Sequence, residues 1–285
     1  MSGEINHNNW DQVIEPRRPL TDWRLRECWH YRDLLGLFIR RDLVATWKQT
    51  ILGPLWLVLQ PLLTTLVYVF IFGKLAGFST DGYPRFLFFL AGITAWNYFA
   101  DCLVKTSSVF KDHAHLFGKV YFPRLLVPVS VVAGGLIRFF IQLVFLLIAI
   151  GVYHFRGFTG GPTLYVWMLP VLVLLMAMLG LGIGLTITAL TTRYRDLAYL
   201  VVFGVQLLMF ATPVVYPLSM APAAYRWIIE LNPLSSVVEQ FRGIFLGGST
   251  PGLSALLYPA LVSLGALITG MFLFQRAEQR FVDTI

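Results

Sequence analysis

Apolar residues in this sequence are gathered into long blocks that carry no charge. Stretches without a single Asp, Glu, Lys or Arg include residues 49–73, 197–225 and 243–275. Each is at least as long as the roughly 20 residues that a membrane-spanning helix needs. The pattern predicts an all-α membrane protein. We expect six transmembrane helices, at about 52–73, 86–104, 125–153, 164–190, 197–216 and 253–274.

The region before the first predicted span is polar. Its first thirty residues mix charges of both signs, so a signal peptide is not expected there. An N-terminal interfacial helix is predicted next, because four apolar residues share one helical face: Tyr31, Leu34, Leu35 and Phe38. The predicted domains are a polar cytoplasmic N-terminal segment at 1–30, a six-span transmembrane domain at 31–280 and a cytoplasmic tail at 281–285.

Composition and charge support the membrane assignment and suggest an orientation. Hydrophobic residues make up 57% of the chain and charged residues only 13%, where a soluble protein carries roughly a quarter. The net charge is +7, but no nucleic-acid-binding motif accompanies it, so nucleic acid is not expected as a partner. With the N-terminus inside, sixteen Lys and Arg fall in inner segments and five in outer ones. The positive-inside rule therefore predicts that both termini are cytoplasmic.

Motifs of the common enzyme classes do not occur in the sequence. There is no G-x-x-x-x-G-K-[ST], no G-x-S-x-G and no H-E-x-x-H, so no enzyme activity and no catalytic residue are expected. His113 and His115 form an H-x-H, but no neighbouring Cys or His completes a tetrahedral set, so we expect no metal or cofactor. Cys28 and Cys102 are not placed for a disulfide. Any uphill transport would need a separate ATPase.

The segment 105–124, "KTSSVFKDHAHLFGKVYFPR", is the longest predicted cytoplasmic connection between spans. Aromatic and apolar side chains recur there at helical spacing, which predicts a short surface helix that contacts the ATPase. The alternative is that these aromatics only anchor the loop among lipid headgroups. The residues predicted to couple the chain to the ATPase are Val109, Phe110, His113, Phe117 and Lys119.

Four segments are distinctive in combination: "FIRRDLVATWKQTILGPLWLVLQPLL" (38–63), "LFGKVYFPRLLVPVS" (116–130), "TTRYRDLAYL" (191–200) and "TPVVYPLSMAPAAYRWIIELNPLSSVVEQFRGI" (212–244). Together they resemble the membrane subunit of bacterial type-two ATP-binding-cassette (ABC) exporters of cell-surface polysaccharides. The resemblance covers about residues 31–280 and is nearest to the O-antigen export permeases. Capsule and teichoic acid export permeases are similar as well.

The resemblance implies a mechanism and a set of partners. It implies a homodimer in the bacterial inner membrane, bound to two ATPase subunits that hold ATP and magnesium. The implied substrate is a lipid-linked polysaccharide, and the loop between spans two and three would contact the ATPase. Two re-entrant helices between spans five and six would form an external gate.

The sequence of that outer segment fits broken helices. Residues 217–248 are too apolar for a simple loop, yet charges and prolines interrupt any full span, and broken helices occur where they line a cavity or are buried in protein. A hairpin lying flat on the outer surface is the alternative. Glu239 and Arg242 are three apart and can pair on one helical face. The predicted gate residues are Tyr216, Pro217, Asn232, Pro233, Glu239 and Arg242.

Two stripes of aromatic and amide side chains suit a path for a polysaccharide, since sugars favour aromatic faces and hydrogen-bonding groups. Packing or lipid contact is the alternative, but an amide that faces lipid lacks a partner. The predicted channel residues are Trp56, Gln60, Thr64 and Tyr68 in span one and Tyr199, Phe203, Gln206 and Phe210 in span five. A third face, of small residues, predicts close helix packing in span four: Ala177, Gly180, Gly184 and Thr188.

Arg138 is a cation deep inside a predicted span, which makes it either a functional residue or part of a structural ion pair. Two other functions stay open for the chain as a whole. One is a related exporter of drugs or lipids, which would not need a wide channel. The other is a membrane-embedded glycosyltransferase, although Asp101, Asp112 and Asp196 are too scattered for a metal-binding acidic motif.

Overall fold

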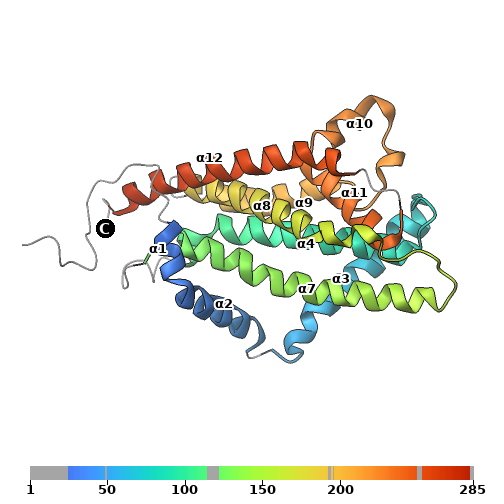
Figure 1. Cartoon of the computed structure of the whole chain (residues 1–285), viewed down its shortest axis with the longest axis horizontal. Coiled ribbons are helices and arrows are strands. Elements are labelled where there is room, and N and C mark those ends of the chain that lie inside the picture. Colours follow the sequence, from blue (N-terminus) through green and yellow to red (C-terminus); the bar gives the residue numbers. More distant parts are fainter. Residues whose placement is uncertain are drawn as a thin grey trace, which may run out of the picture.

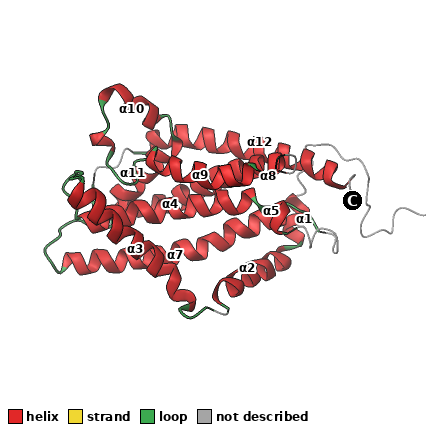
Figure 2. Ribbon diagram, turned by 180° about the vertical axis from the view of Figure 1, so that it is seen from behind, coloured by secondary structure: helices red, strands yellow, loops and turns green. Residues whose placement is uncertain are grey.

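The computed structural model describes residues 25–48, 50–113, 122–191, 194, 196–248 and 252–282. Over these ranges the chain is helical and contains no β-strand (Figures 1 and 2), so the predicted all-α fold is confirmed. The α-helices are α1 (Leu25–His30), α2 (Arg32–Trp47), α3 (Trp56–Tyr68), α4 (Arg85–Ser107), α5 (Val109–Asp112), α7 (Leu126–His154), α8 (Leu169–Thr191), α9 (Leu197–Phe210), α10 (Ala223–Glu230), α11 (Pro233–Leu246) and α12 (Leu257–Val282). Short 3-10 segments precede several of them, at Gly53–Leu55, Leu164–Met168, Leu218–Met220 and Leu253–Leu256, and a π-helical segment, Val69–Leu75, continues α3.

The long helices run side by side along the longest axis of the molecule (Figure 1). Helices α1, α2 and α5 and the C-terminal end of α12 lie at one end, which we call the α5 end (Figures 1 and 2). Helix α10 projects from the opposite end, which we call the α10 end. The loops 76–84 and 155–163 also lie at the α10 end. Each of these loops joins two long helices that run in opposite directions.

Five helical segments are long and apolar enough to cross a membrane, and they match five of the six predicted spans. They are Gly53–Leu75, Arg85–Ser107, Leu126–His154, Leu164–Thr191 and Leu253–Glu278. The sixth predicted span, about 197–216, contains only the 14-residue helix α9, which ends at Phe210. A helix of that length spans about 21 Å, less than the roughly 30 Å of a bilayer core. The count of six spans stays a prediction.

The early end of α9 has a local cause. Pro213 has no backbone N–H to donate, and a residue that precedes proline avoids the helical region, which disfavours helix at Thr212. The chain turns over residues 211–217 instead, and the turn is stabilised by bonds to α11 that are described below. The prediction that the helix continues to about Tyr216 was therefore wrong in its C-terminal limit.

Helix α4 forms the centre of the bundle. Among the 18 most apolar consecutive residues of α4, 78% are buried within the chain. The corresponding share for Gly53–Leu75 is 11%. Helices α3, α7, α8 and α11 all pack against α4. Because so much of Gly53–Leu75 remains uncovered within one chain, its outward surface must face lipid or another protein molecule.

Small residues let α8 approach its neighbours closely, as predicted. A Cβ at Gly180 would lie 2.8 Å from Cys102 Cβ of α4, and a Cβ at Gly184 would lie 2.6 Å from Thr106 Cβ. The hydroxyl of Thr188 donates to the carbonyl of Thr106. On its other side α8 packs along α12, and the two helices meet through Gly182 and Gly270. The small-residue face is thus a packing surface.

The helix predicted before the first span is present as α2, which packs along α7, and its place at the membrane interface stays a prediction. Phe38 is buried in a cluster with Val109, Phe122 and the first turns of α7, and its ring lies 5.6 Å from that of Phe122. Tyr31, Leu34 and Leu35 are partly buried against the same cluster. Arg40 and Arg41 stay exposed. One side of α2 is therefore packed on the bundle, and its exposed residues include cations as well as Leu37 and Val44.

Candidate functional site

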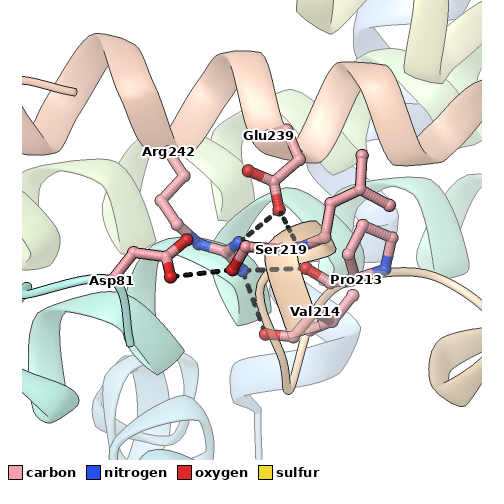
Figure 3. Close-up of polar contacts among 7 residues, drawn as sticks. Asp81, Pro213, Val214, Ser219, Glu239 and Arg242 are labelled. Carbon is pink, nitrogen blue, oxygen red and sulfur yellow. Dashed lines mark hydrogen bonds and ion pairs between the residues drawn. The ribbon is translucent and has the colours of Figure 1, made fainter. Parts of the chain in front are cut away.

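The buried side chain of Arg242 joins α11 to the turn after α9 (Figure 3). Its Nη1 atom lies 3.0 Å from Glu239 Oε1 and donates a hydrogen bond to it. Its Nη2 atom donates to two backbone carbonyls, those of Pro213 at 2.9 Å and Val214 at 3.1 Å. The predicted pairing of Glu239 with Arg242 is present. The other two acceptors of the guanidinium are backbone carbonyls, and the pattern of side chains in the sequence does not predict contacts with them.

Helix α4 completes the surroundings of this guanidinium. The centre of the Arg242 guanidinium lies 3.7 Å from the centroid of the Phe88 ring, a close cation–π contact. One turn further, a Cβ at Gly92 would lie 2.9 Å from Arg242 Nη2 and 2.8 Å from the carbonyl oxygen of Val214. Glycine is therefore required at 92 for the turn and the guanidinium to lie against α4.

Glu239 and the neighbouring loop hold the next residues of the turn. Glu239 Oε1 also accepts from the backbone N–H of Leu218 at 3.3 Å. The hydroxyl of Ser219 donates to Asp81 Oδ1 at 2.8 Å, which ties the turn to the loop 76–84 (Figure 3). We call Asp81, Ser219, Glu239 and Arg242, with the carbonyls of Pro213 and Val214, the Arg242 cluster. The Arg242 cluster lies at the α10 end of the bundle, where α4, α11 and the turn after α9 meet.

The other predicted gate residues lie around the same turn. Asn232 caps α11, since its Oδ1 accepts from Leu234 N at 3.1 Å, and Pro233 occupies the first helical position, where its missing N–H costs nothing. Asn232 Nδ2 donates to Thr212 Oγ1 at 2.7 Å. Tyr216 donates from its hydroxyl to the carbonyl of Phe210 at 3.0 Å, and Pro217 precedes the 3-10 turn Leu218–Met220. Two of the six predicted gate residues, Tyr216 and Pro217, thus lie within the segment 210–220, and three others, Asn232, Glu239 and Arg242, bond to it. Pro233 begins α11 beside Asn232.

The predicted stripe on α9 faces outward from the chain. Tyr199 is 79% exposed, Phe203 59% and Phe210 50%, and Gln206 is exposed as well. Val201 and Val205, on the opposite side of α9, are buried. Tyr199, Phe203 and Gln206 therefore face outward, while Phe210 is half covered and its ring lies 6.4 Å from that of Phe72 of the same chain.

The predicted stripe on α3 is exposed at its start and packed at its end. Trp56 and Gln60 are exposed, Thr64 is partly exposed, and Tyr68 is half-buried. The hydroxyl of Tyr68 lies 3.5 Å from Met209 Sδ, and the Phe72 and Phe210 rings lie 6.4 Å apart. The two stripes thus meet near the α10 end, whereas the first residues of α3 lie well away from α9 (Figures 1 and 2).

The described part of the predicted coupling loop packs into the α5 end. Val109 and Phe110 are buried, and the Phe110 ring stacks on Phe274 of α12, with centroids 4.7 Å apart and planes 4° apart. His113 is partly buried, and this burial, together with Arg41, lowers the pKa of its imidazole below the ordinary value. Phe117 and Lys119 lie outside the described residues. Contact with an ATPase stays a prediction for all five residues.

Arg138 has a carboxylate neighbour in the structure, Asp101 of α4, which the sequence could not identify. Among the described residues no group of three or more His, Cys, Asp or Glu is arranged to hold a metal ion. Three polar features of the described chain are thus the Arg242 cluster, the outward stripes and the charges around Asp101.

Residues 33–246 match the model of the family described as "ABC-2 type transporter", which is most of the chain. The chain belongs to the ABC-2 type transporter family. It is accordingly a multi-pass membrane protein and a transporter subunit.

Individual relatives of this ABC-2 type transporter are similar over nearly their whole length. An O-antigen export system permease protein, RfbA, of Myxococcus xanthus is 31% identical over 263 residues, which cover 92% of this chain and 98% of the relative. A protein of the same name from Klebsiella pneumoniae is 28% identical over 256 residues, covering 89% of this chain and 95% of the relative.

Proposed function

We propose that this chain is the permease subunit of an exporter of a lipid-linked, O-antigen-like polysaccharide. The observation that carries the proposal is the similarity, over 92% of the chain, to a permease named for O-antigen export. The outward stripe of α9 fits a polysaccharide, because rings contact the apolar faces of sugars without holding them tightly and one amide can exchange hydrogen bonds with successive hydroxyls. A moving polymer needs such weak, repeated contacts.

The proposed assembly is a homodimer with two ATPase subunits in the bacterial inner membrane. The uncovered surfaces of α3 and α9 suit a second copy of the chain, with the path between the copies. ATP and magnesium would be bound by the ATPases, since the sequence has no phosphate-binding loop. Both termini would be cytoplasmic, so the α5 end faces the cytoplasm and the α10 end faces outward.

In the proposed transport step, a displacement at the α5 end is transmitted through α4 to the Arg242 cluster. Closure of the ATPases would push on the segment 105–124, whose described part is stacked on α12 through Phe110 and Phe274. Helix α4 continues directly from that segment to Phe88 and Gly92 beside Arg242. A shift of α4 along its axis would disturb the contacts of Arg242 and release the turn 211–217 from α11.

The function is tested by replacing Phe203 and Phe210 with Leu in cells depleted of the native permease. The wild-type chain is expected to restore surface polysaccharide, and the double variant to restore several-fold less per inserted molecule, with polysaccharide accumulating inside. Both positions stay apolar, so insertion should be unaffected. The readouts are surface polysaccharide per membrane-inserted permease and the melting temperature of the purified complex.

The matched control is Phe140→Leu with Phe272→Leu, which removes two outward rings from α7 and α12 that are 50% and 39% exposed. This control should export normally. Equal defects in both double variants, or normal export with lowered stability in the α9 variant, would show that the α9 stripe serves packing rather than transport.

Orientation is tested with single cysteines at Ser79 and Lys111, both exposed, in a chain whose native Cys28 and Cys102 are replaced by Ala. In spheroplasts a membrane-impermeant maleimide should label Ser79→Cys within the normal reaction time. Lys111→Cys should react only after the membrane is permeabilised. The opposite labelling pattern would place the α10 end in the cytoplasm.

A further inference from the structure

Three charged side chains meet between α4 and α7, away from the Arg242 cluster. Arg138 Nε of α7 lies 3.1 Å from Asp101 Oδ2 of α4. Lys105, one turn after Asp101, places its Nζ 3.0 Å from the same oxygen. We call Asp101, Lys105 and Arg138 the Asp101 cluster. It lies within two helices that are long and apolar enough to span a membrane.

The Asp101 cluster carries one positive charge more than it can neutralise. Within the ranges that the structure describes, Asp101 is the only carboxylate paired with either cation, and both cations share one of its oxygens. A guanidinium has five N–H donors and an ammonium has three, so most of these donors have no acceptor in the pair. An excess cation inside a membrane is costly unless an anion or water reaches it.

The cluster is open to its surroundings rather than sealed in the core. The side chains of Asp101 and Lys105 are each 38% exposed and that of Arg138 is 18% exposed. One turn toward the α10 end, Asn97 donates an amide hydrogen bond to Gln142 at 3.2 Å, so the polar strip continues along α4 and α7. A ligand could therefore approach both cations from outside the bundle.

The position of the cluster favours a ligand from the membrane. Asp101 lies six residues before the end of α4 at Ser107, about 9 Å along the helix axis. In α7, Gly134 lies one turn before Arg138 and faces Ile39 of α2. A Cβ at Gly134 would lie 3.9 Å from Ile39 Cγ2. The cluster therefore lies just inside the α5 end, next to the amphipathic α2. If the α5 end lies at the membrane surface, as the proposed orientation requires, this distance places Asp101 near the start of the lipid chains of the adjoining leaflet.

We propose that Lys105 and Arg138 bind a phosphate group of a lipid, with Asp101 holding the two cations together when the lipid is absent. A guanidinium can donate two parallel hydrogen bonds to phosphate oxygens, and an ammonium adds a point charge. The inference rests on the proposed function, since a lipid-linked substrate has its headgroup at this leaflet. The phosphate comes either from such a carrier lipid or from a bulk phospholipid.

The experiment measures binding of radiolabelled farnesyl diphosphate to the purified permease–ATPase complex in phosphatidylcholine nanodiscs. Arg138→Gln and Lys105→Gln should each weaken binding by about ten-fold, the effect of losing one charge-assisted contact. Each variant leaves Asp101 paired with the remaining cation, so the fold should be retained. Asp101→Asn removes the competing anion and should leave binding unchanged or make it tighter.

Competitors distinguish the source of the phosphate. Phosphatidylglycerol that competes as well as unlabelled farnesyl diphosphate would assign the site to bulk lipid, and weaker competition would assign it to an isoprenoid carrier. Inorganic pyrophosphate should compete poorly, and equal competition would overturn the lipid part of the proposal. Arg226→Gln, which breaks an exposed Arg–Glu pair at the α10 end, is the matched control and should bind normally.

Two results would overturn the site altogether. In the first, binding is the same in the wild type, Arg138→Gln and Lys105→Gln. In the second, Asp101→Asn weakens binding as much as Arg138→Gln, as expected if the cluster only stabilises the fold. Failure of the proposed function is distinguishable, because the chain would then export no polysaccharide while farnesyl diphosphate binding still depended on Lys105 and Arg138.

Discussion

Replacing Arg242 with Met is expected to lower the free energy of unfolding by about 3 kcal/mol or more, a large effect for one side chain. The substitution leaves two carbonyls of the turn after α9 without their donor and takes the cation from Glu239, which keeps only the N–H of Leu218. It also removes the contact with the Phe88 ring. Removing one partner of a buried ion pair costs about 3–5 kcal/mol, because the other partners stay buried and unpaired. SDS titration of the purified chain in mixed micelles measures the change.

Arg226 provides a matched control, since it pairs with Glu230 in the same Arg–Glu combination but with both side chains about half exposed. Arg226→Met should change the free energy of unfolding by less than about 1 kcal/mol, because surface ion pairs contribute little. Similar losses in the two variants would show that the buried contacts of Arg242 contribute no more than a surface pair.

Replacing Gly182 or Gly270 with Ala is expected to destabilise the chain by about 3 kcal/mol. A Cβ at Gly182 would lie 2.5 Å from backbone atoms of Ala266 and Leu267, and a Cβ at Gly270 would lie 2.2 Å from the carbonyl oxygen of Gly182. Backbone cannot rotate away as a side chain does, so α8 and α12 must separate along their shared surface. Inserting a group into a well-packed interior costs typically about 1–3 kcal/mol, and more where backbone must move.

Gly265→Ala is the control for the close approach of α8 to α12. Gly265 lies in α12 as Gly270 does, but a Cβ there would have no neighbouring atom within 4 Å. Gly265→Ala should stabilise the chain by about 0.5–1 kcal/mol through the better helix propensity of alanine. Thermal unfolding of the three variants side by side gives the comparison. A loss of stability in Gly265→Ala equal to that in Gly270→Ala would rule out helix approach as the cause.

Local sequence patterns predicted most of the helices. Apolar blocks with few charges mark the five long helices, and small residues at helical spacing mark the side of α8 that packs on α4. These predictions succeed because the bilayer thickness and the helical repeat relate residues that are near one another in the chain. The α9 prediction failed at its end because the apolar run continues past Thr212, although the backbone turns there.

Pairings along one helix could be predicted, and pairings between helices could not. Glu239 and Arg242 are three residues apart, so their contact follows from helical geometry. The contacts of Arg242 with Phe88 and with the carbonyls of Pro213 and Val214 join segments far apart in the sequence. A backbone carbonyl has no sequence signature, since every residue carries one.

The sequence by itself determined that this protein is a helical membrane protein, where its long helices lie, and which residues line one face of α3 and α9. Only the tertiary structure decided that Phe110 is stacked on Phe274, that Arg138 shares Asp101 with Lys105, and that Arg242 is buried against α4. The physical reason is that hydrophobic length and helical period act locally along the chain. The partner of a buried charge or ring depends instead on which helices pack together, and at what register.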